Sequence, residues 1–286
     1  MPFAACDGIR TRYELIGDGP PLLMFSPGGF NATVENWSTF SIYERLNLIE
    51  HLSARYTCIA FDKRESGQSG GRIEHVTWSD YARQGDALLD HLGIERAHVF
   101  GGCIGCSIAL ELAVARPPRV ASLVLYSPAG GPRYRMTQER RFREHLSFAE
   151  ERGLAAVVDL ARSSSATFAQ DPRVGPWVNV LRTEDVDLDD GSYAAATSAT
   201  ADSLFDRDTV PGPEPEVLMT REVPALVVPG NDANHALSAA HYLHECLPQS
   251  ELWNVLPDDQ TNENAPHRVL EFLDQSSDSP RSSAAI

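Results

Sequence analysis

The chain has 286 residues, of which 42% are hydrophobic and 22% are charged, and its formal net charge at pH 7 is −16. This length and composition suit one large domain, or a core domain that carries an insertion, with enough apolar residues for a full core. The negative charge argues against nucleic acid and against an anionic membrane surface as partners, because both are themselves anionic. We therefore expect a small-molecule substrate, and the oligomeric state stays open.

The cysteines, the N-terminal residues and the apolar runs bear on where the protein resides. The five cysteines are an odd, scattered number, so we expect reduced thiols and no disulfide framework. The N-terminus, MPFAACDGIR, lacks the basic and apolar segments of a secretion signal. No uninterrupted apolar run approaches the roughly 18 residues of a membrane span. We expect a cytoplasmic protein with no membrane partner.

Short apolar runs alternate with longer helical patterns along most of the chain, which is typical of a parallel sheet with helices on both faces. We expect strands at 21–25, 56–61, 97–100, 121–126, 224–228 and 251–256. A helix is predicted at 81–92, where Gly93 ends it. A second helix is predicted at 104–114, and it should be buried because it is apolar nearly all round.

The alternation of strands and helices breaks between residues 130 and 215. Residues 138–162 predict two amphipathic helices rich in arginine and glutamate, and the remainder has weak periodicity. We interpret 130–215 as a helical lid inserted into a core formed by 1–129 and 216–274. Residues 275–286 are rich in serine, and we expect them to form a disordered tail.

The segment Gly101-Gly102-Cys103-Ile104-Gly105 lies between an apolar strand and an apolar helix. A nucleophile at the top of a sheet needs such a sharp strand-to-helix turn, and its flanking residues must be small because the backbone is strained and crowded. The helix dipole also favours a thiolate at this position. We predict that Cys103 is the nucleophile, and the alternative is an inert buried thiol. Cys106 completes a C-x-x-C pair without a second ligand pair, so we interpret it as core packing.

The segment Asp62-Lys-Arg-Glu-Ser-Gly-Gln-Ser69 resembles the D-x-R-G-x-G-x-S loop of the lid-bearing α/β hydrolases, with Glu65 in place of the first glycine. The helix-strand-turn stretch at 88–105 and the Arg-Pro-Pro-Arg-Val stretch at 116–120 resemble the same family in order and spacing. The resemblance covers nearly the whole chain outside the lid. It implies an α/β-hydrolase fold, with a mostly parallel central sheet flanked by helices and a helical lid insertion. Dienelactone hydrolases also resemble the chain in having cysteine at this turn, but the lid and the Asp62 loop fit the lid-bearing group better.

Ser26-Pro27-Gly28-Gly29-Phe30 stands where the family has an H-G-G or H-G-x-P segment. In the family, a backbone N–H of this segment and the N–H of the residue after the nucleophile form the oxyanion hole. The resemblance therefore implies Gly29 and Ile104 as the two donors. The alternative is an ordinary Pro-Gly turn after a strand.

The resemblance also implies an acid after the strand at 224–228 and a histidine after the last strand. Asp232 supplies the acid, but residues 255–262 contain no histidine, and Thr261 cannot act as a base near neutral pH. We predict that His235, supported by Asp232, is the base, because it lies on a loop at the carboxyl end of a strand, where open α/β sheets bind ligands. The alternatives are His267, which begins the last helix, or no histidine base at all.

These residues together predict a cysteine-dependent hydrolase of a small-molecule ester, lactone or thioester, with no metal and no cofactor. C–C bond hydrolysis occurs in the same lid-bearing group and stays open. Because the glycine-histidine pair of the family is missing, two other classes of function stay open as well. One is a non-hydrolytic enzyme, such as a lyase or cyclase of a biosynthetic pathway, and the other is a ligand-binding receptor without turnover.

Overall fold

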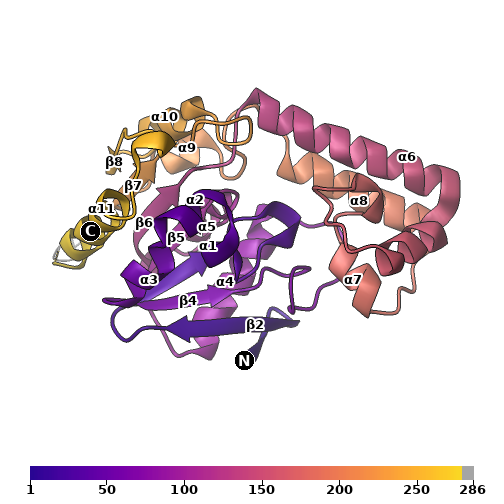
Figure 1. Cartoon of the computed structure of the whole chain (residues 1–286), viewed down its shortest axis with the longest axis horizontal. Coiled ribbons are helices and arrows are strands. Elements are labelled where there is room, and N and C mark those ends of the chain that lie inside the picture. Colours follow the sequence, from indigo (N-terminus) through magenta and orange to yellow (C-terminus); the bar gives the residue numbers. More distant parts are fainter. Residues whose placement is uncertain (279–286) are drawn as a thin grey trace.

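The computed structural model describes residues 1–278 of the chain, and its centre is one eight-stranded sheet (Figure 1). The strand order is β1-β2-β4-β3-β5-β6-β7-β8. The first two strands pair antiparallel with each other, β2 pairs antiparallel with β4, and every later neighbour in the order is parallel. The strands are β1 (Phe3–Cys6), β2 (Ile9–Ile16), β3 (Pro21–Phe25), β4 (Thr57–Phe61), β5 (Ala97–Gly102), β6 (Val120–Tyr126), β7 (Ala225–Val228) and β8 (Ser250–Leu252). The prediction of an α/β fold with a mostly parallel sheet is confirmed.

The six strands expected from the sequence are all present, but the sequence analysis missed the hairpin of β1 and β2. Asp7 and Gly8 connect these strands, and both have positive φ angles, as a two-residue hairpin turn requires. Strand β5 runs two residues beyond its expected end, through Gly102, and therefore delivers the chain directly to Cys103. Strand β8 ends at Leu252, four residues before its expected end.

Helices cover both faces of the sheet, and each face has its own hydrophobic cluster. One cluster contains residues of α4 (Trp78–His91), α5 (Gly105–Ala115) and α10 (Leu237–Cys246). The opposite cluster contains residues of α1 (Asn36–Thr39), α2 (Ser41–Leu46), α3 (Leu48–Ser53) and α11 (Asn264–Asp278). The expected helix at 104–114 is α5, and eight of its residues are buried, because it packs between the sheet and α4.

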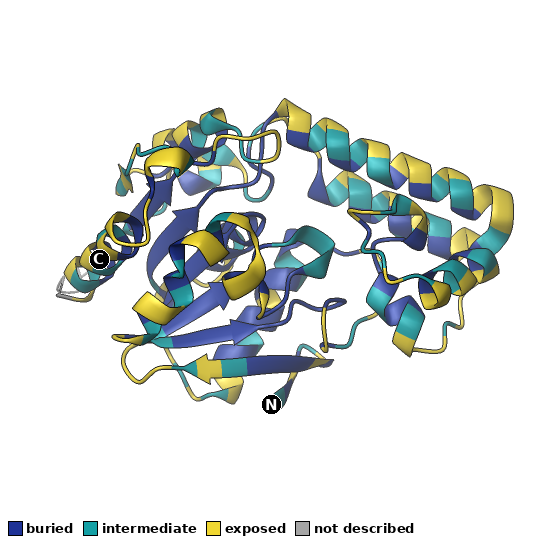
Figure 2. Cartoon of the chain, viewed as in Figure 1, coloured by how far each residue is buried: buried dark blue, intermediate teal, exposed yellow. Residues whose placement is uncertain are grey.

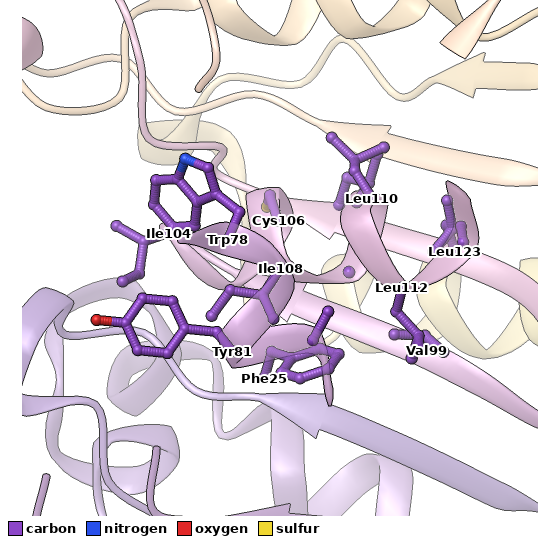
Figure 3. Close-up of a cluster of buried hydrophobic side chains, with 14 of the residues drawn as sticks. Phe25, Trp78, Tyr81, Val99, Ile104, Cys106, Ile108, Leu110, Leu112 and Leu123 are labelled. Atoms are coloured by element: carbon purple, nitrogen blue, oxygen red, sulfur yellow. The ribbon is translucent and has the colours of Figure 1, made fainter. Parts of the chain in front are cut away.

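The first cluster has an aromatic end and an aliphatic end (Figure 3). Trp78, Tyr81 and Ile104 lie together at one end, and Val99, Leu110, Leu112 and Leu123 lie at the other. The aliphatic end fills the interface between the sheet and α5. The aromatic end borders the cavity described below, so the same packing that stabilises the core also forms a wall of that cavity.

Residues 130–215, which we call the helical segment, lead from β6 to α9 (Pro215–Leu218) and contain most of the remaining helices (Figure 1). Helix α6 (Pro132–Ser163) is interrupted at Gly153, where φ is 79° and ψ is 162°, so the expected pair of helices is two helical stretches that meet at a break. Helix α6 packs against α7 (Val178–Thr183) and α8 (Asp190–Leu204), and these helices bury a third hydrophobic cluster. Their outward faces are exposed (Figure 2). The short 3-10 turns of the chain are η1 (Gly29–Asn31), η2 (Pro117–Arg119), η3 (Pro172–Val174) and η4 (Pro257–Asp259).

Helix α11 ends at Asp278 and therefore includes residues 275–278, which we expected to belong to a disordered tail. The hydroxyls of Ser276 and Ser277 donate to the carbonyls of Phe272 and Leu273 at 2.8 Å, and the Ser277 hydroxyl also lies 3.0 Å from His98 Nε2 on β5, a contact that ties this end of the helix to the sheet. The rest of the expected tail, 279–286, lies outside the described residues. Within the described range, none of the helices has both the length and the apolar character needed to cross a membrane.

Candidate active site

Cys103 stands at the turn between β5 and α5 with a φ of 56°, a left-handed conformation that is uncommon for a residue with a side chain. The turn is so tight that its glycines cannot carry a Cβ. A Cβ added to Gly101 would lie 2.4 Å from the Gly105 carbonyl oxygen. A Cβ added to Gly105 would lie 2.2 Å from the Phe25 carbonyl oxygen. The structure thus explains the small residues two positions before and after Cys103, and it presents the sulfur at the carboxyl edge of the sheet.

The side chains of Cys103, His235 and Asp232 form a continuous chain of contacts. His235 Nε2 lies 3.1 Å from Cys103 Sγ. The other ring nitrogen, Nδ1, lies 2.9 Å from each carboxylate oxygen of Asp232. Cys103, His235 and Asp232 are the predicted nucleophile, base and acid, and their side chains lie in contact in that order.

The loop after β7 reaches Cys103 because its backbone is held on two sides. The Asp232 carboxylate accepts the backbone N–H groups of Asn234 and His235 at 2.7 and 2.9 Å, which closes the loop on itself. Gly130, just beyond β6, donates to the Asn234 carbonyl at 3.0 Å and accepts from the Ala236 N–H at 3.3 Å. The bonds of Asn234 and Ala236 to Gly130 hold His235, which lies between them, opposite Gly130, and the His235 ring lies against the sulfur.

The charges of the three residues shift one another's pKa. Burial alone would raise the pKa of the Cys103 thiol, but the positive charge of His235 and its hydrogen bond hold that pKa below its ordinary value. Burial opposes the charged form of His235, yet the Cys103 thiolate and the Asp232 carboxylate raise the pKa of the ring to about 10. The hydrogen bond from His235 lowers the pKa of Asp232 to about 2. The arrangement therefore favours a thiolate–imidazolium pair near neutral pH.

Two backbone groups also approach the Cys103 sulfur, and they come from Ile104 and Gly28. The predicted oxyanion-hole residues, Ile104 and Gly29, both line the cavity beside Cys103, and their role stays a prediction. The Gly28 N–H is a further backbone group that faces the sulfur. Pro27 has no N–H, so Gly28 supplies the first amide after that proline.

Asn36 fixes the loop that carries Gly28. Its amide nitrogen donates to the carbonyls of Pro27 and Asn31, both at 2.7 Å. Gly28 has a φ of 120°, and a Cβ there would lie 2.2 Å from the Asn36 amide. The sequence analysis did not find Asn36, because a buried asparagine on a short helix has no motif to mark it. Its contacts indicate that it positions the Gly28 N–H.

The loop after β8 is where the family pattern places its histidine, and here its buried side chain is Gln260. This side chain is fully buried; it accepts from Tyr126 Oη at 2.5 Å and donates to the Val255 carbonyl at 2.7 Å. Thr261 lies beside the start of α11, where its hydroxyl accepts from the Asn264 N–H at 3.1 Å. His267, the alternative base, is exposed on α11 and does not line the cavity.

The second cysteine of the C-x-x-C pair does not take part in these contacts. Cys106 is fully buried on α5, and its thiol donates to the Gly101 carbonyl at 3.2 Å. Burial raises the pKa of Cys106 well above its ordinary value, so it stays a thiol. In the part of the chain that the structure describes, no three His, Cys, Asp or Glu side chains gather as a metal site would require.

A cavity of about 420 Å³ opens beside Cys103 and His235. Its walls come from the loop after β3, from the start of α4 and from the helical segment. The aromatic part of the wall comes from Phe30, Phe40, Trp78, Tyr81, Tyr134, Phe168 and Phe205. The polar part of the lining includes Asn31, Asn36, Lys63, Gln138, Arg141, Gln170 and Asn234. The volume suits a small molecule with an apolar body and a few polar groups.

A family model and a curated relative each match part of the chain. Residues 21–174 match the model of the alpha/beta hydrolase fold family. The chain is 38% identical over 128 residues to a dihydrolipoyllysine-residue acetyltransferase component of an acetoin cleaving system from Cupriavidus necator, a match that covers 45% of this chain and 32% of that protein. The chain thus matches about a third of the length of this curated relative.

Two solved structures resemble the whole described molecule. A meta-cleavage product hydrolase from Pseudomonas fluorescens superposes with a TM-score of 0.63 at 19% identity, covering 96% of this chain and 98% of that one. An enol-lactonase from Burkholderia xenovorans superposes with a TM-score of 0.62 at 21% identity, covering 96% and 100%. At these identities the likeness concerns the fold.

Proposed function

Because this chain belongs to the α/β-hydrolase fold family, we propose that it is a hydrolase of a small-molecule ester, lactone or thioester, with Cys103 as its nucleophile. The observation that carries the proposal is the 3.1 Å contact between Cys103 Sγ and His235 Nε2, backed by Asp232 at 2.9 Å. A thiolate beside an imidazolium is already activated for attack on a carbonyl. Solved relatives of the same fold include a hydrolase and an enol-lactonase, which supports the reaction class.

The proposed cycle has two halves. In the first, the Cys103 thiolate attacks the carbonyl carbon, and the oxygen takes up the negative charge beside the N–H groups of Ile104 and Gly28. The intermediate collapses as the His235 imidazolium gives its proton to the leaving group, which leaves an acyl thioester on Cys103. In the second half, neutral His235 takes a proton from water, and the hydroxide attacks the thioester carbonyl. The bond to sulfur then breaks, which releases the carboxylic acid and regenerates the Cys103 thiolate beside the His235 imidazolium.

The remaining residues have supporting roles in this proposal. Asp232 holds the His235 ring in one orientation and stabilises its charge, and Asn36 keeps the Gly28 N–H directed at the site. We propose that the helical segment acts as a lid, because Tyr134, Phe168 and Phe205 from it line the cavity together with residues of the core. A cavity enclosed in this way limits the water that reaches the thioester.

A panel of p-nitrophenyl esters and the corresponding thioesters tests the proposal. We expect turnover by the wild-type protein, an acyl adduct on Cys103 detectable by mass spectrometry, and loss of turnover in Cys103→Ala. Full turnover in Cys103→Ala would refute the role of the thiol. Thermal stabilisation by the esters without any turnover would favour the receptor interpretation instead.

A further inference from the structure

Lys63 is the only lysine in the 286-residue sequence, and it lines the cavity next to Cys103. Its side chain is 4% exposed. The nitrogen lies 4.1 Å from the centre of the Tyr81 ring and 5.5 Å from the centre of the Phe30 ring, and both rings belong to the cavity wall. The proposed catalytic cycle makes no use of this residue.

The positive charge of Lys63 is only partly compensated by the protein. Its ammonium group has three donors, and one of them is used, by the Arg64 carbonyl at 3.1 Å. The nearest carboxylate, Glu65, lies 3.9 Å from Nζ and is bound more tightly by Arg64, at 2.5 Å. Burial accordingly lowers the pKa of Lys63 to about 8. A ligand with an acceptor oxygen would satisfy the donors that the protein leaves free.

The charges of the cavity differ in sign from those of the whole protein. The chain carries a net charge of −16, yet among the described residues that line the cavity none is aspartate or glutamate, while Lys63 and Arg141 are both present. Arg141 is half-buried, and its guanidinium makes a 3.4 Å contact with the Ala169 carbonyl. An anionic molecule would therefore gain from entering this cavity, although the rest of the surface repels it.

Glu65 shows how this arrangement is maintained. It stands where the family has glycine, and its φ of 60° is the conformation that a glycine would adopt without strain. Its buried carboxylate binds Arg64, which also binds Glu74 at 2.5 Å. Arg64 is fully buried in these ion pairs and does not line the cavity, so the cation of this loop that faces a ligand is Lys63.

We propose that the substrate carries a carboxylate, and that Lys63 is the residue that binds it in the cavity, beside the rings of Tyr81 and Phe30. The inference rests on the proposed hydrolase function and names its substrate class: esters, lactones or thioesters that bear a free carboxylate. A single ammonium group among aromatic rings offsets one negative charge. A carboxylate, with one negative charge, therefore fits, whereas a phosphate dianion would keep one buried negative charge without a partner. The apolar part of the substrate lies against Phe30, Tyr81 and their neighbours.

Paired substrates test the proposal by turnover. The p-nitrophenyl monoesters of succinate, glutarate and adipate are compared with the same compounds capped as methyl esters at the far carboxyl. We expect the wild-type protein to prefer the best acid over its methyl-capped partner by at least about tenfold in kcat/KM, because a charge-assisted hydrogen bond is worth roughly that factor or more. Lys63→Met should remove this ratio, and Lys63→Arg should keep most of it. Arg141→Met, which removes the other cavity cation, should lower the ratio much less than Lys63→Met does, because Arg141 is only half-buried and already contacts the Ala169 carbonyl.

The single lysine also gives a test that needs no turnover. In protein labelled with ¹³Cε-lysine, one lysine signal reports the titration of Lys63. Glutarate should raise the pKa of this signal by about one unit or more, because an anion favours the charged form, and the neutral glutaramide should leave it in place. Equal effects of the two compounds, or an acid preference that survives in Lys63→Met, would overturn the inference.

The two tests separate this inference from the proposed function. If the capped and uncapped esters are hydrolysed equally well, the hydrolase proposal stands and the carboxylate proposal falls. If neither is hydrolysed but glutarate alone shifts the Lys63 signal, the carboxylate site stands and the hydrolase proposal falls.

Discussion

The loops after β7 and β8 leave the same edge of the sheet from neighbouring parallel strands, yet they do different work. The loop at 229–236, here the β7 loop, carries Asp232 and His235 and contacts Cys103. The loop at 253–261, here the β8 loop, buries Gln260 and contributes no side chain to the cavity lining. In the family pattern that the sequence resembles, the histidine belongs to the second of these loops.

The two loops indicate that the space above Cys103 can be occupied from either side. Parallel strands end together, so two loops that are far apart in sequence converge above one point of the sheet. The β7 loop brings its histidine there by folding around Asp232, and the bridge between Gly130 and His235 fixes its position. In our proposal the β8 loop does not supply the base. Its Gln260 side chain instead bonds the Tyr126 hydroxyl and the Val255 carbonyl.

Removing the histidine of the β7 loop should give the largest effect. We predict that His235→Ala lowers kcat/KM for the best ester by about 10² to 10⁴-fold, because a positioned general base contributes that much. His267→Ala, on the surface of α11, is the matched control and should retain full activity. A loss in His267→Ala, with His235→Ala unaffected, would move the base to the alternative position.

The acid of the same loop should matter less. We predict that Asp232→Asn lowers kcat/KM by roughly 10²-fold, the low end of the range for a positioned base, since the ring remains but loses the charge that stabilises its protonated form. Asp232 and Cys103 together raise the pKa of His235 to about 10, so the alkaline limb of the pH–rate profile should move to lower pH in this variant. An unmoved alkaline limb would show that another group controls it.

In the β8 loop, a substitution should affect stability and spare the chemistry. We predict that Gln260→Ala lowers the free energy of unfolding by about 1–3 kcal/mol, because the Tyr126 hydroxyl and the Val255 carbonyl lose a buried partner. The value of kcat/KM should change by less than about fivefold, which is small against the loss expected for His235→Ala. Urea denaturation and ester kinetics on the same preparation check both numbers. A stable but inactive Gln260→Ala would contradict the separation of roles.

A histidine outside both loops, His98, should give the smallest effect, and its pKa is shifted downward whereas that of His235 is shifted upward. His98 is buried on β5 beside Ser122 and Ser277, and burial lowers its pKa to about 4. Its pKa is lower in the folded than in the unfolded chain, so its contribution to stability is present above the unfolded pKa and is lost as the pH falls toward about 4. We predict a loss of ~1 kcal/mol between pH 7 and pH 6 that is reduced in His98→Gln, measured by urea denaturation.

The sequence was sufficient for the elements that follow simple patterns. Strands β3 to β7 are apolar runs, and the turn at Cys103 has its glycines at fixed spacing, so both were predictable. The hairpin of β1 and β2 was not, because β2 buries Arg12, which pairs with Glu14 at 2.5 Å and with Glu35 at 2.6 Å and interrupts the apolar alternation. Charge pairs between distant segments leave no periodic signal.

Some residues of the candidate site could likewise be predicted from the sequence, and others could not. His235 was predictable because it is three residues from Asp232 on a loop at the sheet edge. The backbone donors Gly29 and Ile104 stay predictions, and both residues line the cavity. The approach of the Gly28 N–H to the sulfur was not predictable, since a motif match does not show which amide turns inward. Asn36 and Lys63 were missed because their importance depends on what surrounds them in space: two carbonyls for Asn36, and a cavity without carboxylates for Lys63.

The central claim is that the β7 loop, through His235, makes Cys103 a thiolate. The rate of iodoacetamide alkylation of Cys103, followed against pH by mass spectrometry of its peptide, measures this directly. In the wild-type protein we predict an apparent pKa below the ordinary cysteine value of about 8.5 and alkylation faster than at the other four cysteines. In His235→Ala the burial remains without the compensating charge, so the apparent pKa should rise above that value. An identical pH profile in the two proteins would contradict the account.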